Sequence, residues 1–189
     1  MSTEKSTAQD TYSAGLLTFP KSGDSASAGG IYTVTCVGSD GVEKWSDTFH
    51  NLVVNEGLQY MNQTFFKGSG YTAVWYLGLV TGPGSGTTYA AGNTLASHAG
   101  WTENTDYTGS RKTVTFGTAS TADPSVISNS ASPSAFSING TATIAGAFLA
   151  STTDNSGVLF SAGDFTGGDK SVASGDTLNV TYQFSLDAA

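Results

Sequence analysis

Hydrophobic and polar residues alternate most regularly near the end of the chain. The residues of one parity are Leu178, Val180, Tyr182, Phe184 and Leu186, and those between them are polar. A repeat of two is typical of a strand with one buried face. Such a strand cannot pair its own backbone groups, so the pattern predicts partner strands and an opposing layer. Its polar face is expected to meet solvent or a partner.

Further strands are predicted at short intervals. Residues 31–37 and 42–49 alternate around Asp40-Gly41, a pair that accepts the positive φ of a tight hairpin turn. Residues 71–80 are a dense run of apolar residues, including aromatic and β-branched ones, which is typical of a strand buried on both faces. Shorter strands are expected at 15–20, 111–118, 126–127 and 158–161, and residues 135–149 are expected to form two strands joined by a turn at Asn139-Gly140.

One segment predicts a helix. Within residues 51–66, Leu58, Met61 and Phe65 recur at helical spacing, and Asn55 is placed to cap the first turn. With the evenly spaced strands and Gly-rich turns, this predicts an all-β fold, an antiparallel β-sandwich or jelly roll with one short helix.

The two ends of the chain differ in pattern. Residues 1–14 are polar and without period, which predicts an extended N-terminal arm that is flexible or ordered by a partner. Residues 15–189 are predicted to form a single β-sandwich domain, because 189 residues and 19.3 kDa suit one core. Within this domain, residues 90–103 show no clear period and are expected to run irregularly over the sheet edge.

The charge of the chain argues against a nucleic-acid partner. The formal net charge is -8, and the seven Lys and Arg residues are spread along the chain, so no nucleic-acid partner is expected. An acidic balance suits solubility or docking on a more basic protein surface. No uncharged apolar run approaches the roughly 18 to 20 residues that span a bilayer, and the amino end lacks a signal-peptide pattern. Neither a membrane partner nor secretion is therefore predicted.

The single cysteine, Cys36, excludes an intramolecular disulfide and a cysteine-rich zinc site. It alternates with Tyr32 and Val34, which predicts a small buried side chain.

No reactive constellation is recognisable. His98 lies near Ser97 and Glu103, but adjacent Ser and His side chains in an extended segment point to opposite faces, and no oxyanion-hole motif accompanies them. The spacing of three aspartates in a Gly-rich region matches no calcium loop: Asp164, Asp169 and Asp176. The chain is therefore predicted to be no enzyme, with no catalytic, cofactor-binding or metal-binding residue and no cofactor.

Several stretches, taken in order and spacing, resemble a group of tailed-bacteriophage virion proteins. They are NLVVNEGLQYMNQTFF, WYLGLV, AAGNTLASHAGWTE, SRKTVTF and LFSAGDFTGGDKSVASGDTLNVTYQFSL, and the resemblance covers residues 30–186. It extends to the cement or decoration proteins on the outside of phage capsids, which look like jelly-roll or sandwich modules at subunit junctions, often as trimers.

The resemblance implies a structural function. A capsid decoration protein would bind the major capsid protein and other copies of itself on the outer capsid surface of the virion, after synthesis in the host cytoplasm. It would stabilise the shell by adding buried area between subunits. The N-terminal arm is a candidate for ordering against a neighbour.

Two alternatives remain open. One is a phage tail, adaptor or fibre module that contacts the host, and the other is a carbohydrate-binding β-sandwich in which Trp101 stacks on a sugar. Under the assembly hypothesis, the candidate interface residues are Tyr12, Leu16, Leu17, Trp101 and Tyr107.

Overall fold

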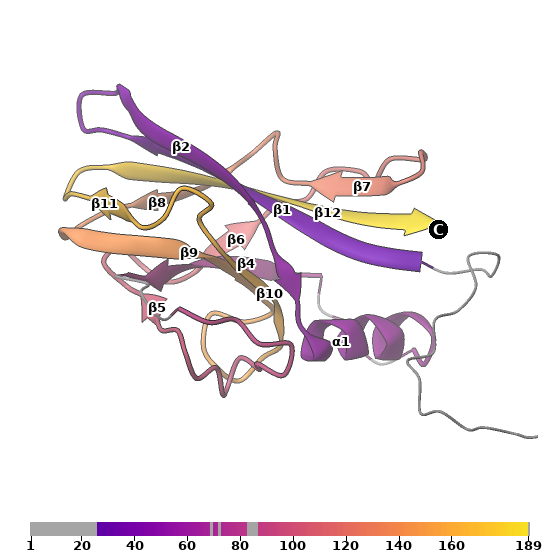
Figure 1. Cartoon of the computed structure of the whole chain (residues 1–189). Coiled ribbons are helices and arrows are strands. Elements are labelled where there is room, and N and C mark those ends of the chain that lie inside the picture. Colours follow the sequence, from indigo (N-terminus) through magenta and orange to yellow (C-terminus); the bar gives the residue numbers. More distant parts are fainter. Residues whose placement is uncertain (1–25, 69, 72, 83–86, 189) are drawn as a thin grey trace, which may run out of the picture.

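Two antiparallel sheets pack face to face, with one helix at an end of the sandwich (Figure 1). The computed structural model describes residues 26–68, 70, 71, 73–82 and 87–188. The first sheet contains β1 (Ala26–Val37), β2 (Glu43–His50), β7 (Ser125–Ser128), β8 (Ser134–Ser137) and β12 (Thr177–Ala188). The second contains β3 (Leu52–Val53), β4 (Trp75–Thr81), β5 (Glu103–Asn104), β6 (Lys112–Val114), β9 (Ala142–Ala150), β10 (Leu159–Asp164) and β11 (Lys170–Val172).

The structure confirms the predicted antiparallel sandwich with one short helix. The predicted strand at 15–20 and the arm at 1–14 lie outside the described residues. The predicted strand at 111–118 is shorter than expected, since only β6 pairs there. The two-residue strands β3 and β5 and the three-residue strand β11 were not predicted, because such short segments carry too few residues to show a period.

Strands β1 and β12 form the central pair of the first sheet. They pair along their whole lengths, from Ala26 opposite Ala188 to Val37 opposite Thr177. On the other side of β1 the predicted hairpin places β2, and Gly41 takes the positive φ of 79° that its turn requires. The longest alternating pattern of the sequence therefore lies at the centre of a sheet.

The second edge of β12 is shared by two short strands. Strand β8 pairs with its first half and β7 with its second half. Between them, the Asn129 side chain accepts a hydrogen bond from the amide of Tyr182 and donates one to the carbonyl of Val180, at 2.7 and 3.2 Å. This buried amide thus replaces the missing strand where the two partners leave a gap.

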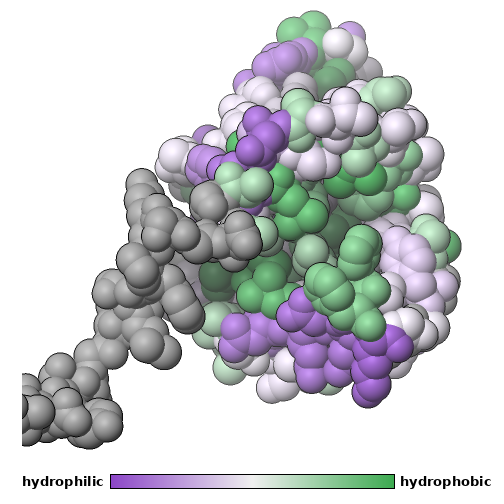
Figure 2. Space-filling model, turned by 90° about the vertical axis from the view of Figure 1, so that its right-hand side faces the viewer, coloured by the Kyte–Doolittle hydropathy of each residue, from purple (hydrophilic) through white to green (hydrophobic). Residues whose placement is uncertain are grey.

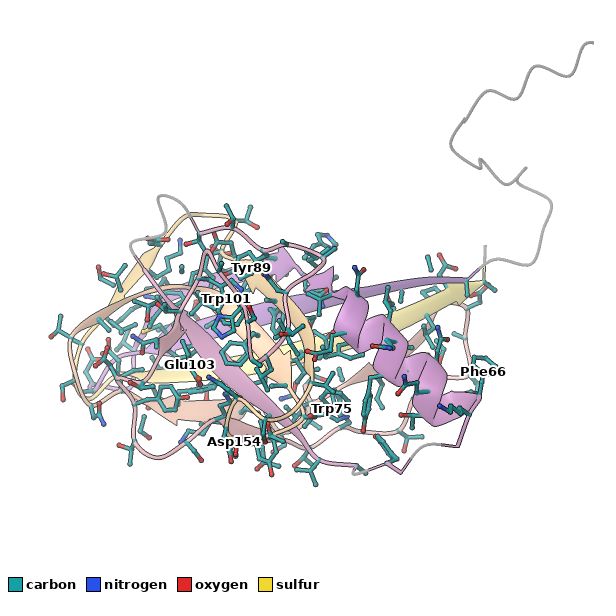
Figure 3. The ribbon with its side chains drawn as sticks, turned by 90° about the horizontal axis from the view of Figure 1, so that it is seen from below. Phe66, Trp75, Tyr89, Trp101, Glu103 and Asp154 are labelled. Carbon is teal, nitrogen blue, oxygen red and sulfur yellow. The ribbon has the colours of Figure 1, made fainter. Side chains whose placement is uncertain are left out.

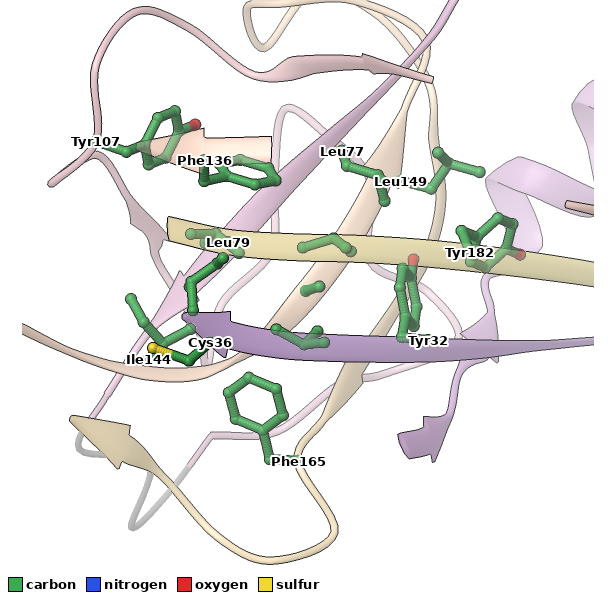
Figure 4. Close-up of a cluster of buried hydrophobic side chains, with 14 of the residues drawn as sticks. Tyr32, Cys36, Leu77, Leu79, Tyr107, Phe136, Ile144, Leu149, Phe165 and Tyr182 are labelled. Atoms are coloured by element: carbon green, nitrogen blue, oxygen red, sulfur yellow. The ribbon is translucent and has the colours of Figure 1, made fainter. Parts of the chain in front are cut away.

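The main core fills the space between the sheets (Figure 4). Strand β12 contributes Leu178, Val180 and Tyr182, all 0% exposed, and β1 contributes Cys36, which confirms the prediction of a buried cysteine. The core also contains hydroxyl groups: Tyr32 lies 2.8 Å from the Ser161 hydroxyl, which in turn contacts Tyr182. These contacts satisfy polar atoms that burial would otherwise leave unpaired.

The second sheet is buried on its outer face as well. Phe148 and Ala150 of β9 point away from the main core. They pack against Leu95 and Trp101, which belong to the connection that joins β4 to β5. The irregular segment at 90–103 therefore covers a face of the sheet, and the prediction that it follows the sheet edge was wrong. The double burial of 71–80 was predicted correctly for the part that forms β4.

Helix α1 (Asn55–Phe65) is held to this sheet at its first turn. Asn55 is not the cap: the N-cap is Val54, and no side chain caps the helix. The carboxylate of Glu56 accepts hydrogen bonds from the amides of Leu95 and Leu159 at 3.1 and 2.7 Å. Gly57 packs so closely on β10 that an added Cβ would lie 2.5 Å from the carbonyl oxygen of Phe160. The start of the helix is thus fixed by direct backbone contact.

Candidate functional site

The predicted interface residues fall into two groups. Tyr12, Leu16 and Leu17 lie outside the described residues. Trp101 and Tyr107 are 6% and 3% exposed in the single chain. Neither ring therefore presents more than a small edge to a partner, and their role at an interface stays a prediction.

The Trp101 indole is covered on several sides (Figure 3). The His98 ring stacks on it with centroids 3.9 Å apart, and the rings of Tyr89 and Phe148 lie 5.9 and 5.2 Å away. Its Nε1 donates to the Asn93 side chain at 3.2 Å. A sugar-stacking platform needs a free aromatic face, and the described neighbours leave this ring little free surface.

Tyr107 and Trp101 lie in different clusters: Tyr107 in the main core between the sheets, and Trp101 on the outer face of the second sheet. The Tyr107 ring packs edge-on against Phe136 with centroids 4.8 Å apart. Burial and the neighbouring Glu103 carboxylate raise the pKa of the Tyr107 hydroxyl well above its usual range. The side chain is part of the main core.

The groups that the sequence places around His98 do not come together as a catalytic unit. Glu103 binds Arg111 instead, accepting bonds from its Nε and from one terminal nitrogen at 2.9 and 2.7 Å. His98 places Nδ1 3.1 Å from the backbone oxygen of Trp101. The histidine and the carboxylate thus have separate structural contacts.

Arg111 is the most heavily bonded buried cation among the described residues. It is 4% exposed, and beyond Glu103 it donates to the carbonyls of Thr152 and Asp154 and to the side chain of Asn155. The guanidinium also lies 4.9 Å from the centroid of the Phe148 ring. Because these acceptors belong to a tight turn, the cluster fixes the 152–155 loop against the sheet.

The aspartates of the Gly-rich region lie in different surroundings. Asp176 is 4% exposed and accepts a bond from Lys44 at 2.7 Å, whereas Asp164 accepts one from the Tyr89 hydroxyl at 3.3 Å. No group of three or more His, Cys, Asp or Glu side chains that could hold a metal ion occurs in the part of the chain that the structure describes. Nor does any helix within the described ranges have the length and apolar character to cross a membrane.

An apolar groove of about 840 Å³ opens at the end of the sandwich where α1 lies (Figure 2). We call it the end groove. One wall is α1 and the residues after it, the other is the end of the first sheet, and the floor is the edge of the main core. The lining residues are Ala26, Ser27, Ala28, Tyr60, Met61, Asn62, Thr64, Phe65, Phe66, Tyr71, Trp75, Phe116, Ile127, Leu149, Phe160, Tyr182, Phe184 and Leu186. All of them are uncharged.

The floor of the end groove is a row of aromatic rings in edge-to-face contact. Tyr60 meets Trp75 with centroids 5.7 Å apart, Trp75 meets Phe160 at 5.4 Å, and Phe160 meets Phe184 at 5.3 Å. This geometry is the favoured one for aromatic pairs, so the rings fix one another. The floor is therefore a preformed apolar surface.

The end groove exists because the two sheets differ in length. The ends of β1 and β12 extend past the second sheet and over α1 (Figure 1). The apolar parity of β12 continues into this overhang, but Phe184 is only partly buried and Leu186 is 41% exposed. Apolar side chains that face the inside of the sandwich thus have no opposing strand at this end.

The rim of the end groove carries the most exposed aromatic side chains of the described residues. Phe65 and Phe66 are 86% and 83% exposed, and Tyr71 is 56% exposed. Figure 3 shows Phe66 at the end of the helix. Exposed apolar groups clustered around one groove mark a surface that binds another apolar group.

Comparisons of this chain with protein-family models, with curated proteins and with solved structures found no match. The functional argument therefore rests on the residues and the geometry of this chain.

Sequence reasoning missed the end groove as a site. The helical spacing of Leu58, Met61 and Phe65 suggested one buried face, yet only Met61 packs against the core, while Leu58 and Phe65 are exposed. A signal for the site was the adjacent aromatic pair Phe65-Phe66 at the end of a short helix, beyond the Tyr60-Met61 pair that packs against the core.

Proposed function

We propose that this protein is a non-enzymatic structural component of a tailed-bacteriophage virion, a cement or decoration protein that binds the outer capsid shell at subunit junctions and stabilises it. The sequence resemblance supplies the class of virion protein. The observation that carries a binding role is the exposure of Phe65 and Phe66, 86% and 83%, at the rim of an uncharged groove.

An exposed aromatic pair favours a protein partner. Aromatic side chains supply large contact areas at low entropy cost and are enriched at the centres of protein interfaces. The net charge of -8 keeps the rest of the surface hydrated and complements a more basic partner surface. The proposed partners are the major capsid protein and further copies of this chain, as a trimer or another homo-oligomer.

The carbohydrate-binding alternative has less support in this geometry. Its proposed platform, Trp101, is 6% exposed and stacked on His98. The tail or fibre alternative uses the same kind of apolar contact, so the number of copies per virion separates it from the capsid role. Many copies on the capsid shell are expected, and a few copies at the tail would contradict the proposal.

Two variants test whether the exposed pair Phe65 and Phe66 binds the capsid. The double variant Phe65→Ser/Phe66→Ser removes the aromatic pair, and Val42→Ser is the matched control, because Val42 is also 61% exposed but lies in the β1–β2 turn. Occupancy on purified capsids that lack the protein is expected to fall by about tenfold or more for the double variant, the scale of a lost interface anchor. The control is expected to bind as the parent does, and unchanged binding of the double variant would contradict the proposal.

A further inference from the structure

The end groove lies directly beside the point where residues 1–25 join the described structure. Ala26, Ser27 and Ala28, the first residues of β1, are themselves lining residues of the groove. The chain preceding Ala26 therefore starts at the groove. Any apolar group within a few residues of this point has the groove within reach.

The sequence before Ala26 contains one apolar stretch. Residues 15–20 read GLLTFP, and residues 11–20 contain no charged residue. Charges occur on both sides of that stretch, at Asp10 and at Lys21. Leu16, Leu17 and Phe19 are thus the apolar side chains closest to the groove along the chain.

The connection is long enough for the stretch to reach the groove. Six Cα-to-Cα steps separate Pro20 from Ala26, and they span at most about 22 Å when the chain is extended at roughly 3.3 to 3.6 Å per residue. The connecting sequence KSGDS contains a glycine, which accepts the conformations of a reversing turn. A short tether of this kind gives an effective concentration in the mM range, well above that of a second copy in dilute solution.

The end groove and residues 15–20 are both apolar. The groove is lined by uncharged residues, and its floor is the aromatic row from Tyr60 to Phe184. A charged segment would lose its hydration there without gaining a partner, whereas leucine and phenylalanine side chains gain by burial. The groove is also overhung by the apolar face of β12, where Leu186 lacks an opposing layer.

We infer that residues 15–20 of this chain seat in the chain's own end groove, with Leu16, Leu17 and Phe19 packed against the aromatic floor beneath the overhang of β12. The segment supplies the opposing layer that the shorter second sheet does not provide. Phe65 and Phe66 remain at the rim. The inference concerns the single chain, so it holds or fails independently of the capsid partner.

The test is nuclear magnetic resonance of the full chain with labelled leucine and methionine methyl groups. Nuclear Overhauser contacts are expected between the methyls of Leu16 or Leu17 and the groove, at Met61 or the ring of Trp75. In a 1:1 mixture of labelled and unlabelled chains these contacts are expected to remain within one molecule. Contacts between molecules would overturn the inference in favour of a second copy, and random-coil shifts at Leu16 and Leu17 would overturn it outright.

A variant pair supports the same test. Leu16→Ser/Leu17→Ser/Phe19→Ser is expected to shift the methyl resonances of Met61 and Leu149 and to raise the fluorescence of an apolar dye several-fold, because the groove is emptied. Ser2→Ala/Thr3→Ala/Ser6→Ala is the matched control in the arm and is expected to change neither. Methyl resonances of Met61 and Leu149 that are identical in the triple serine variant and the parent would overturn the inference.

Discussion

The two ends of the β1–β12 pair have the same sequence pattern and different surroundings. At the end beside the β1–β2 turn, Leu178 and Cys36 are fully buried between the sheets. At the other end, Phe184 and Leu186 have the same parity but face the end groove. The difference shows that an alternating pattern specifies which face of a strand is apolar, whereas the length of the opposing layer decides whether that face is covered.

The buried end should be far more sensitive to truncation than the open end. Leu178→Ala is expected to lower the free energy of unfolding by about 2 to 5 kcal/mol, because it removes fully buried methyl groups and leaves a cavity. Leu186→Ala at the open end is expected to cost about 1 kcal/mol or less. Urea unfolding at neutral pH measures both. A cost at Leu186 equal to that at Leu178 would contradict the contrast between the ends.

The open end of the sandwich also contains one tightly packed point, the start of α1 at Gly57. Gly57→Ala is expected to lower the free energy of unfolding by about 1 to 3 kcal/mol, because the new methyl group meets the backbone of Phe160. The gain in helix propensity, about 1 kcal/mol, offsets only part of this. Gly92→Ala, whose added Cβ would have no neighbour within 4 Å, is the control and is expected to change stability by less than about 0.5 kcal/mol. Equal melting temperatures for the two variants would show that the helix start is not tightly packed.

The smallest expected effect is a pH dependence at the buried end. The hydrogen bond from the Lys44 ammonium, with a further one from the Ala173 amide, holds the pKa of Asp176 below its ordinary value. A lowered pKa in the folded state stabilises the fold above the unfolded pKa of about 3.9, and that contribution is lost as pH falls through the folded value.

The variant Asp176→Asn tests this linkage. Urea unfolding between pH 7 and pH 3 is expected to show the variant less stable than the parent at neutral pH, with the gap shrinking below about pH 4. The exposed Glu43→Gln is the control and is expected to follow the parent at every pH. A gap between Asp176→Asn and the parent that stays constant over this range would contradict the assignment.

Much of the fold was predictable from local pattern. The alternation of residues 178–186 and the Asp40-Gly41 turn identify β12 and the β1–β2 hairpin, because both signals lie within a few residues. The helix was also recognisable by its spacing, although its cap was not, since Val54 caps it without a side-chain bond. Local signals therefore fixed the type of element more securely than its boundaries.

The candidate site was much less predictable. The end groove depends on where the second sheet stops relative to β12, and sequence spacing does not record that distance. Trp101 looked like a surface aromatic because its segment has no period, but it packs on the outer face of the second sheet. The bond between Arg111 and Glu103 likewise joins residues of two different segments, and nothing local in the sequence distinguishes either of them from a solvated charge.

The pairing of Ala26 with Ala188 has a mechanical consequence. Both residues lie at the same end of adjacent antiparallel strands, so a force that pulls them apart acts along the hydrogen bonds between β1 and β12. The bonds would then open one after another, like a zipper, and not all at once as in shear. Under the proposed capsid function, the load would have to pass through the helix, the loops or the groove. Any tether attached beyond these two residues would peel the central pair of the sheet from its open end.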